Sequence, residues 1–261
     1  MIGQYYPVDS FWHKADPRGK IVALFLYFLA LFVAKDIYAK VAVTILLLIG
    51  IHFSNIPVTL ILKSLRPILL FIILTGLLNA FMIPGEILWQ WGIFKITEEG
   101  IYQGIWMAWR LILLMLSASL LTLSTTPISF TDGLESLMKP LNMVKVPVHE
   151  LAMMISIALR FIPTLMEEGE RIIQAQMARG MDFKRGSFKD RIMNILPLLV
   201  PFFLSAMKRA DELAEAMESR GYHGGSGRTR MRVLSFQVSD MLLVSFMGIF
   251  VVLLVIYRWI G

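Results

Sequence analysis

Hydrophobic residues gather in five runs, and polar stretches separate these runs along the chain. The runs cover Ile21–Ala34, Val41–Phe53, Pro67–Ile83, Ile105–Leu123 and Met241–Ile260. A helix needs about 20 predominantly apolar residues to cross a bilayer, so each run is a candidate span. The first two runs reach this length only with flanking residues such as Lys20 and Lys40, whose long side chains can extend to the interface. We therefore expect about five transmembrane helices, with one re-entrant hairpin over the first two runs as the alternative.

Two long helices are predicted between the fourth and fifth runs. Each begins with an apolar half and continues with a charged face at helical spacing. The expected hinges are the prolines inside them, Pro163 in the first helix and Pro197 and Pro201 in the second. Such helices can lie along the cytoplasmic membrane surface. If the apolar halves Leu151–Met166 and Ile192–Met207 also cross the bilayer, the chain has seven spans instead.

The chain is therefore expected to be an all-α integral membrane protein with three parts. These are an N-terminal membrane domain with four spans (1–124), a cytoplasmic coupling-helix domain (125–239) and a C-terminal span (240–261). Within the middle part, the capping-box spacing of Asp132-Gly133-Leu134-Glu135 predicts the start of a short helix that ends near Lys139.

Composition supports the membrane class and gives an orientation. Hydrophobic residues make up 57% of the chain, charged residues only 17%, and the mean hydropathy is +0.68. Most of the 25 Lys and Arg residues fall on one side of the predicted spans, which by the positive-inside rule is the cytoplasm. We expect a multi-pass protein of a bacterial plasma membrane with a cytoplasmic N-terminus. The net charge of +6 then reflects this bias, and no nucleic-acid partner is expected.

The sequence gives little support for an enzymatic function. There is no Cys, the four His residues are scattered, and no phosphate-binding G-x-x-x-x-G-K-[ST] motif occurs. Glu167 and Glu168 are expected to lie on a solvated helix face, with Glu168 paired to Arg171 one turn later. We therefore predict no catalytic residue, no metal site and no cofactor in this chain.

A weak internal repeat relates the two long helices. With a shift of 41 residues, Phe161 falls on Phe202 and Met166 on Met207, and both helices end on a similar tripeptide. The two tripeptides are Ala178-Arg179-Gly180 and Ser219-Arg220-Gly221. Glycine after a last helical turn is a common cap, and a nearby cation complements the helix dipole. An arginine flanked by small residues also suits an acidic groove of a partner. From the residues alone, the cap and the docking tip remain equally good interpretations.

A further short motif precedes the first apolar run. In Asp16-Pro17-Arg18, Asp16 is suited to cap a helix and Pro17 to occupy its first position. We interpret these three residues as a structural motif.

Three stretches give the chain a family likeness. They are His13-x-x-Asp16-Pro17-Arg18-x-Lys20, the segment Leu159–Leu165 followed by Glu168, and the pair formed by 178–182 and 219–221. In their order and spacing they resemble the transmembrane T component (EcfT) of energy-coupling factor transporters, over essentially the whole chain. Ser219 departs from the alanine of the family pattern, but it is also small.

The resemblance implies a subunit that joins two cytoplasmic ABC-type ATPases to a substrate-binding membrane S component for uptake of vitamins or similar micronutrients. ATP and Mg²⁺ would be bound by the ATPases. Residues 178–180 and 219–221 would dock in the ATPase grooves, and the apolar halves of the long helices would face the S component. The rival interpretation is a stand-alone channel or secondary transporter in which the arginines only cap helices, and a membrane scaffold without transport is a third.

Overall fold

The computed structural model describes residues 5–91, 94–144, 146–181, 188–224 and 234–260. This part of the chain is helical except for one two-stranded hairpin. It divides into two compact units, which are described separately: residues 1–137 with 233–261, and residues 138–232. The domain boundary that we expected between residues 124 and 125 lies upstream of this division, in the short connection before residue 127.

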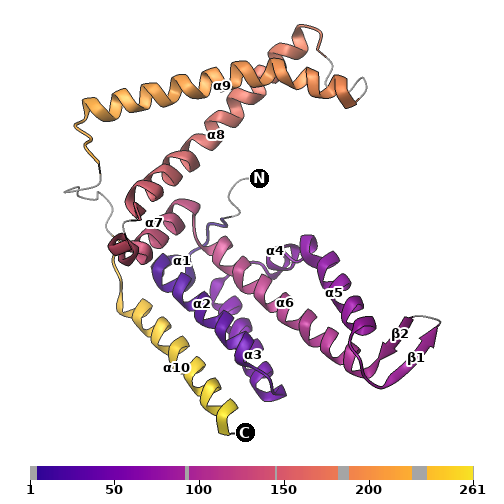
Figure 1. Ribbon diagram of the computed structural model, residues 1–261. Helices are drawn as coiled ribbons and strands as arrows, with labels where there is room; N and C mark the ends of the chain where they lie inside the picture. Colours follow the sequence, from indigo (N-terminus) through magenta and orange to yellow (C-terminus); the bar gives the residue numbers. More distant parts are fainter. Residues whose placement is uncertain (1–4, 92–93, 145, 182–187, 225–233, 261) are drawn as a thin grey trace. The chain divides into compact units, whose positions relative to one another are not determined.

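The first unit contains most of the helices (Figure 1). In chain order its elements are α1 (Phe11–Lys14), α2 (Pro17–Val33), α3 (Ile37–Ser54), α4 (Val58–Lys63), the 3₁₀ turn η1 (Arg66–Ile68), α5 (Leu69–Met82), β1 (Ile87–Trp91), β2 (Phe94–Thr97), α6 (Glu98–Ser124), α7 (Pro127–Met138) and α10 (Val238–Ile260).

Helix α2 occupies the centre of this unit. It packs against α10, which follows some 200 residues later in the chain, and also against α3 and α6. The side chains of Ala30, Leu31 and Val43 are fully buried where α2 meets its neighbours. Many other apolar side chains stay exposed, for example Phe25 and Phe71 at 62% and 61%. Such a surface is unfavourable in water but matches the hydrocarbon of a bilayer.

The prediction of an all-α membrane protein is confirmed. Within the described residues, five helical segments are long and apolar enough to cross a membrane, judged by length and composition. Four coincide with predicted runs, and the fifth is α8 (Val148–Ala178), whose apolar half belonged to the rival seven-span scheme. Helix α2 has only 17 residues and is not among the five, although it lies at the centre of its unit. Its length agrees with the shortness of the first apolar run.

Two local predictions need correction. Helix α7 begins at Pro127, well before Asp132, because Thr126 accepts a hydrogen bond from the Ser129 amide at 3.3 Å and Pro127 fits the first helical position. The β1–β2 hairpin, in which Trp91 pairs with Phe94, was not predicted. Its strands have only five and four residues, so their alternation of apolar and polar positions is hard to recognise between two apolar runs.

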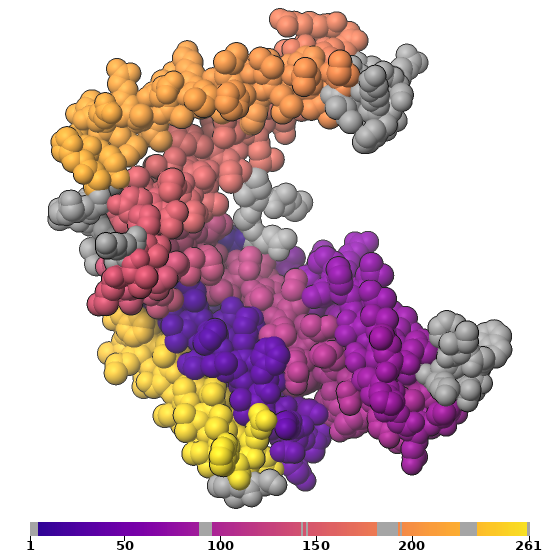
Figure 2. Space-filling view, viewed as in Figure 1, coloured from indigo at the N-terminus to yellow at the C-terminus, as the bar shows by residue number. Residues whose placement is uncertain are grey.

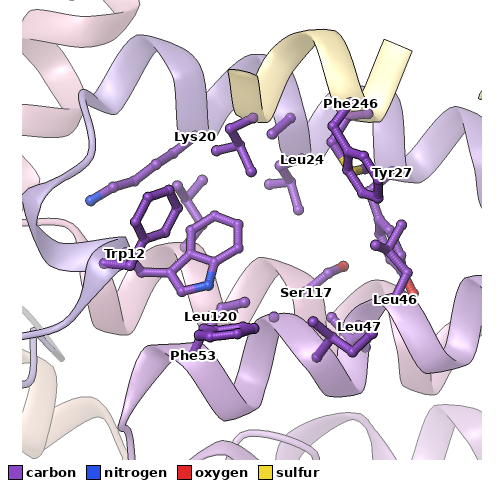
Figure 3. Close-up of a pocket in the computed structure, with 17 residues that line it drawn as sticks. Trp12, Lys20, Leu24, Tyr27, Leu46, Leu47, Phe53, Ser117, Leu120 and Phe246 are labelled. Atoms are coloured by element: carbon purple, nitrogen blue, oxygen red, sulfur yellow. The ribbon is translucent and has the colours of Figure 1, made fainter. Parts of the chain in front are cut away.

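An apolar cavity of about 490 Å³ lies among α1, α2, α3, α6 and α10 (Figure 3). Trp12 and the stem of Lys20 line one part, and Tyr27, Leu46, Leu47 and Phe246 line another. A methyl group added at Gly50 would lie 3.5 Å from the Trp12 ring, so this glycine contributes to the open space. The cavity leaves a mostly apolar hollow beside the first half of α2.

The second unit consists of the 3₁₀ segment η2 (Lys139–Val144) and two long helices, α8 and α9 (Phe188–Ser219), here called the coupling helices. They have 31 and 32 residues, which correspond to roughly 45–48 Å at 1.5 Å per residue. Both remain continuous through their internal prolines. Within this unit α8 and α9 cross each other, as Figure 1 shows.

Candidate functional site

Both coupling helices end in the same capping structure. At the end of α8, the Gly180 amide donates to the Met177 carbonyl at 3.0 Å, and the Met181 amide donates to the Gln176 carbonyl at 3.1 Å. At the end of α9, the Gly221 amide donates to Glu218 at 2.9 Å, and the Tyr222 amide donates to Met217 at 3.0 Å. These paired bonds define a Schellman motif at each end.

The glycines are required by this backbone geometry. Gly180 has a φ angle of +89° and Gly221 one of +72°, in the left-handed region where other L-residues are strained. A methyl group added at either position would meet no heavy atom within 4 Å. The glycines are therefore required by the backbone conformation and not by close packing of a neighbouring group.

The arginines beside these glycines are exposed. Within the described residues, neither Arg179 nor Arg220 forms an ion pair or a side-chain hydrogen bond. The flanking residues Ala178 and Ser219 are exposed as well. The Ser219 hydroxyl donates to the Ala216 carbonyl of its own helix at 3.1 Å, so it presents a small surface much like alanine. We call residues 178–180 and 219–221 the two arginine tips. Asp182, part of the motif that suggested the family, lies outside the described residues.

The cap and docking interpretations are thus compatible in structural terms. The glycine completes the cap, and the side chain of the adjacent arginine forms no described hydrogen bond or ion pair with its own helix. A guanidinium that keeps its five donors free at a rigid helix end is suited to bind carboxylates or backbone carbonyls of a partner. The chain presents two such arginines, each at the end of a long helix.

The coupling helices contact each other through a charged pair and a small residue. Arg209 on α9 donates to the Glu168 carboxylate on α8 at 3.4 Å. A methyl group added at Gly169 would lie 3.6 Å from the Phe202 ring. Further along, the Gln176 side-chain amide donates to the Pro197 carbonyl at 3.5 Å. The predicted pair of Glu168 with Arg171 is wrong, because Glu168 faces α9 and meets Arg209.

The expected hinge prolines lie in or near this crossing. Pro197 accepts the bond from α8, Pro201 is half-buried, and Pro163 is exposed on α8. A proline inside a helix removes one backbone hydrogen bond and allows bending at that point. Their role as hinges remains a prediction.

The coupling helices also expose a long apolar surface that is rich in methionine. In Figure 2 the visible face of α9, in orange, is uncovered along its length. Methionine side chains adapt to surfaces of different shape. The exposed apolar residues include Met154, Ile155, Met166, Ile173, Met177, Met193, Leu196, Leu199, Phe203, Leu204 and Met207.

The Asp16-Pro17-Arg18 motif forms a buried polar network at the start of α2. The Asp16 side chain caps the helix by accepting from the Arg18 amide at 2.9 Å, with Pro17 in the first turn. The Asp16 amide in turn donates to the Asp240 carboxylate at 2.8 Å. Asp240 is 1% exposed and lies in the first turn of α10, so the network joins the start of α2 to the start of α10.

Lys20 extends the same network to α6. Its ammonium donates to the Ser124 carbonyl at 3.1 Å and to the Thr125 hydroxyl at 3.3 Å. Lys20 is only 3% exposed, and so does not extend to the interface as the sequence suggested. Sequence reasoning missed Asp240 and Thr125, although an acidic residue just before the last apolar run was a usable signal.

Comparisons with known proteins find a family model and relatives that cover most of the chain. The family model described as "Cobalt transport protein", CbiQ, matches residues 9–233. The chain is 47% identical over 259 residues to the energy-coupling factor transporter transmembrane protein EcfT of Ruminiclostridium cellulolyticum, covering 99% of this chain and 97% of that protein. It is 47% identical over 241 residues to EcfT of Bacillus subtilis, covering 92% and 91%. EcfT of Listeria innocua is 44% identical over 245 residues, covering 94% and 92%.

Proposed function

The chain belongs to the CbiQ family, which includes the EcfT transmembrane components of energy-coupling factor transporters, and on this premise we propose that it couples ATP hydrolysis to uptake. It would link two cytoplasmic ABC-type ATPases to a substrate-binding membrane S component that carries a vitamin or similar micronutrient. ATP and Mg²⁺ would be bound by the ATPases, and this chain would be a non-catalytic subunit.

The observation that carries this proposal is the pair of arginine tips. Arg179 and Arg220 are exposed at the ends of 31- and 32-residue helices, each fixed by the same cap. Two similar contact points suit two similar partners, and a guanidinium fits a groove lined by carboxylates. Each tip would dock in one ATPase.

The crossing of α8 and α9 would convert ATPase movement into movement in the membrane. When the ATPases close on ATP, the tips would approach each other, and the helices would turn about the crossing at Glu168 and Arg209. The exposed methionine-rich faces would then shift against the S component. Methionine suits this contact because its flexible side chain can pack in more than one arrangement.

The experiment is a pull-down of the detergent-solubilised protein from its native membranes. We compare the wild type with Arg179→Glu/Arg220→Glu and with a control, Arg171→Glu/Lys208→Glu. The control makes the same charge change at exposed positions of the same two helices, away from the tips. Two ATPase subunits should accompany the wild type and the control but not the tip variant. If all three retain the ATPases, the tips are not the interface, and if none retains them, the coupling function itself is wrong.

A further inference from the structure

A cluster of basic and aromatic side chains lies at the other end of α2, away from Asp16 and Lys20. Its members are Lys40 near the start of α3, and Trp106 and Arg110 on α6. The Lys40 ammonium lies 3.3 Å from the centroid of the Trp106 ring. Arg110 follows Trp106 by one helical turn, so both side chains share a face of α6, and its guanidinium lies 5.2 Å from the Phe32 ring.

The donors of this cluster have no partner in the part of the chain that the structure describes. Lys40 is 8% exposed and forms neither an ion pair nor a hydrogen bond there. The Trp106 indole nitrogen and the Arg110 Nε atom are buried and have no hydrogen-bond partner. Asp36 precedes Lys40 by one turn, but its carboxylate forms no described ion pair and no cap bond with α3.

Such an arrangement is costly unless something else completes it. Two cations on adjoining helices repel each other, and a buried donor without an acceptor loses the hydrogen bonds that it makes in water. The Trp106 ring offsets part of the cost for Lys40 through a cation–π contact, and the Phe32 ring does the same for Arg110, but the indole N–H and the Arg110 Nε–H remain without an acceptor. An anion with several acceptor oxygens would satisfy all three groups.

We propose that Lys40, Trp106 and Arg110 bind the phosphate group of a bilayer phospholipid. The cluster lies where the membrane helices α2 and α3 meet, so the phosphate of a neighbouring lipid is an available anion. Apolar side chains around it remain exposed, including Phe32 at 57% and Ile105 at 61%, and they would contact the acyl chains. The bound phosphate would bridge α3 and α6 beside the existing bond from the Trp109 indole to Thr44 at 3.1 Å. This site is independent of the ATPase-coupling function.

The test titrates phosphatidylglycerol into the purified full-length chain in detergent and counts bound lipid by native mass spectrometry. The variants are Lys40→Gln/Arg110→Gln and, as a matched control, Lys63→Gln/Arg66→Gln, which removes two exposed cations elsewhere in the same unit. The wild type and the control should bind with equal affinity, and the cluster variant at least tenfold more weakly. Equal binding by all three proteins overturns the proposal.

Further arms identify the ligand and guard against misfolding. Diacylglycerol with the same acyl chains lacks the phosphate and should not bind, and binding as strong as that of phosphatidylglycerol would overturn the proposal. Displacement of the lipid by millimolar inorganic phosphate would show that the free anion also binds, whereas no displacement assigns the site to the lipid ester alone.

The variant Trp106→Phe controls for misfolding. It keeps an aromatic ring under Lys40 but removes the indole N–H, so it should weaken lipid binding several-fold without lowering the midpoint of thermal unfolding. Unchanged affinity in this variant and in the cluster variant would refute the site.

Discussion

Arg209 and Glu168 form an ion pair at 3.4 Å between positions that are separated by 41 residues, the same shift that relates the two coupling helices in the sequence. The bond therefore joins two positions that the repeat makes equivalent. The contact of Gly169 with Phe202 is of a different kind, because Phe202 is the equivalent of Phe161 and not of Gly169.

Exchanging the charges of this pair should preserve the crossing, whereas reversing one charge should weaken it. Glu168→Arg and Arg209→Glu each place like charges together, and both side chains are about one-third exposed or less, at 27% and 34%. We expect a coupling energy of about 0.5–1 kcal/mol from a double-mutant cycle on thermal unfolding, with the double exchange close to wild type. The exposed pair of Lys208 with Glu212 is the control, and its exchange should show no coupling. Equal losses in single and double variants would mean that the pair does not hold the crossing.

If the tips dock as proposed, changing the glycine of a tip should disturb docking without removing a charge. Gly180→Ala or Gly221→Ala puts a side chain in the left-handed region, at a cost of roughly 1–2 kcal/mol, which the helix end can avoid by unwinding its cap. The adjacent arginine would then lose its fixed position, and ATP-dependent uptake in membrane vesicles should fall. Gly180→Asn should be milder because asparagine tolerates this conformation. Gly248→Ala, in the middle of α10, is the control. Normal uptake by both alanine variants would contradict the need for a rigid tip.

Features that depend on local sequence were predictable, and contacts between distant segments were not. The caps at Gly180 and Gly221 follow from helical periodicity followed by glycine, and the cap at Asp16 follows from an acidic residue before proline. The partner of Glu168 was mispredicted because helix spacing favours Arg171, whereas Arg209 comes from another helix. Asp240 was missed for a similar reason, since 224 residues separate it from the Asp16 amide that it binds. No periodicity reveals such a pairing.

Asp240 should be more important for stability than its position before the last span suggests. Its carboxylate accepts from the Asp16 amide at 2.8 Å and from the Gln237 amide at 2.9 Å while almost fully buried. In Asp240→Asn one of these N–H groups would face an NH₂ donor, at a cost of about 1–3 kcal/mol. A lower thermal midpoint in detergent is the expected result. Asp9→Asn serves as a control, because the Asp9 side chain is 96% exposed. Equal midpoints for both variants would show that the network joining α2 to α10 is dispensable.

The N-terminal segment should lose stability in mild acid because of His13. Its Nε2 atom donates to the Tyr6 carbonyl at 2.9 Å, which can only accept, so in the neutral ring Nδ1 accepts from the Ser10 hydroxyl at 2.7 Å. Burial is the main cause that lowers the pKa of His13 below the usual 6.5, and the bond to Tyr6 partly opposes it. Below pH 6.5 the unfolded segment therefore binds a proton more readily than the folded one.

The stability that the neutral His13 ring contributes to the N-terminal segment is therefore complete above pH 6.5. It declines as the pH falls below that value. Amide hydrogen exchange of the segment around Tyr6, followed from pH 7.5 to pH 5, should show protection falling at the acid end after correction for the intrinsic exchange rate. In His13→Gln this pH dependence should disappear, because glutamine does not titrate there. His223→Gln, which changes an exposed histidine near the second tip, should keep the wild-type profile. A profile in His13→Gln identical to the wild type would assign the acid response to another group.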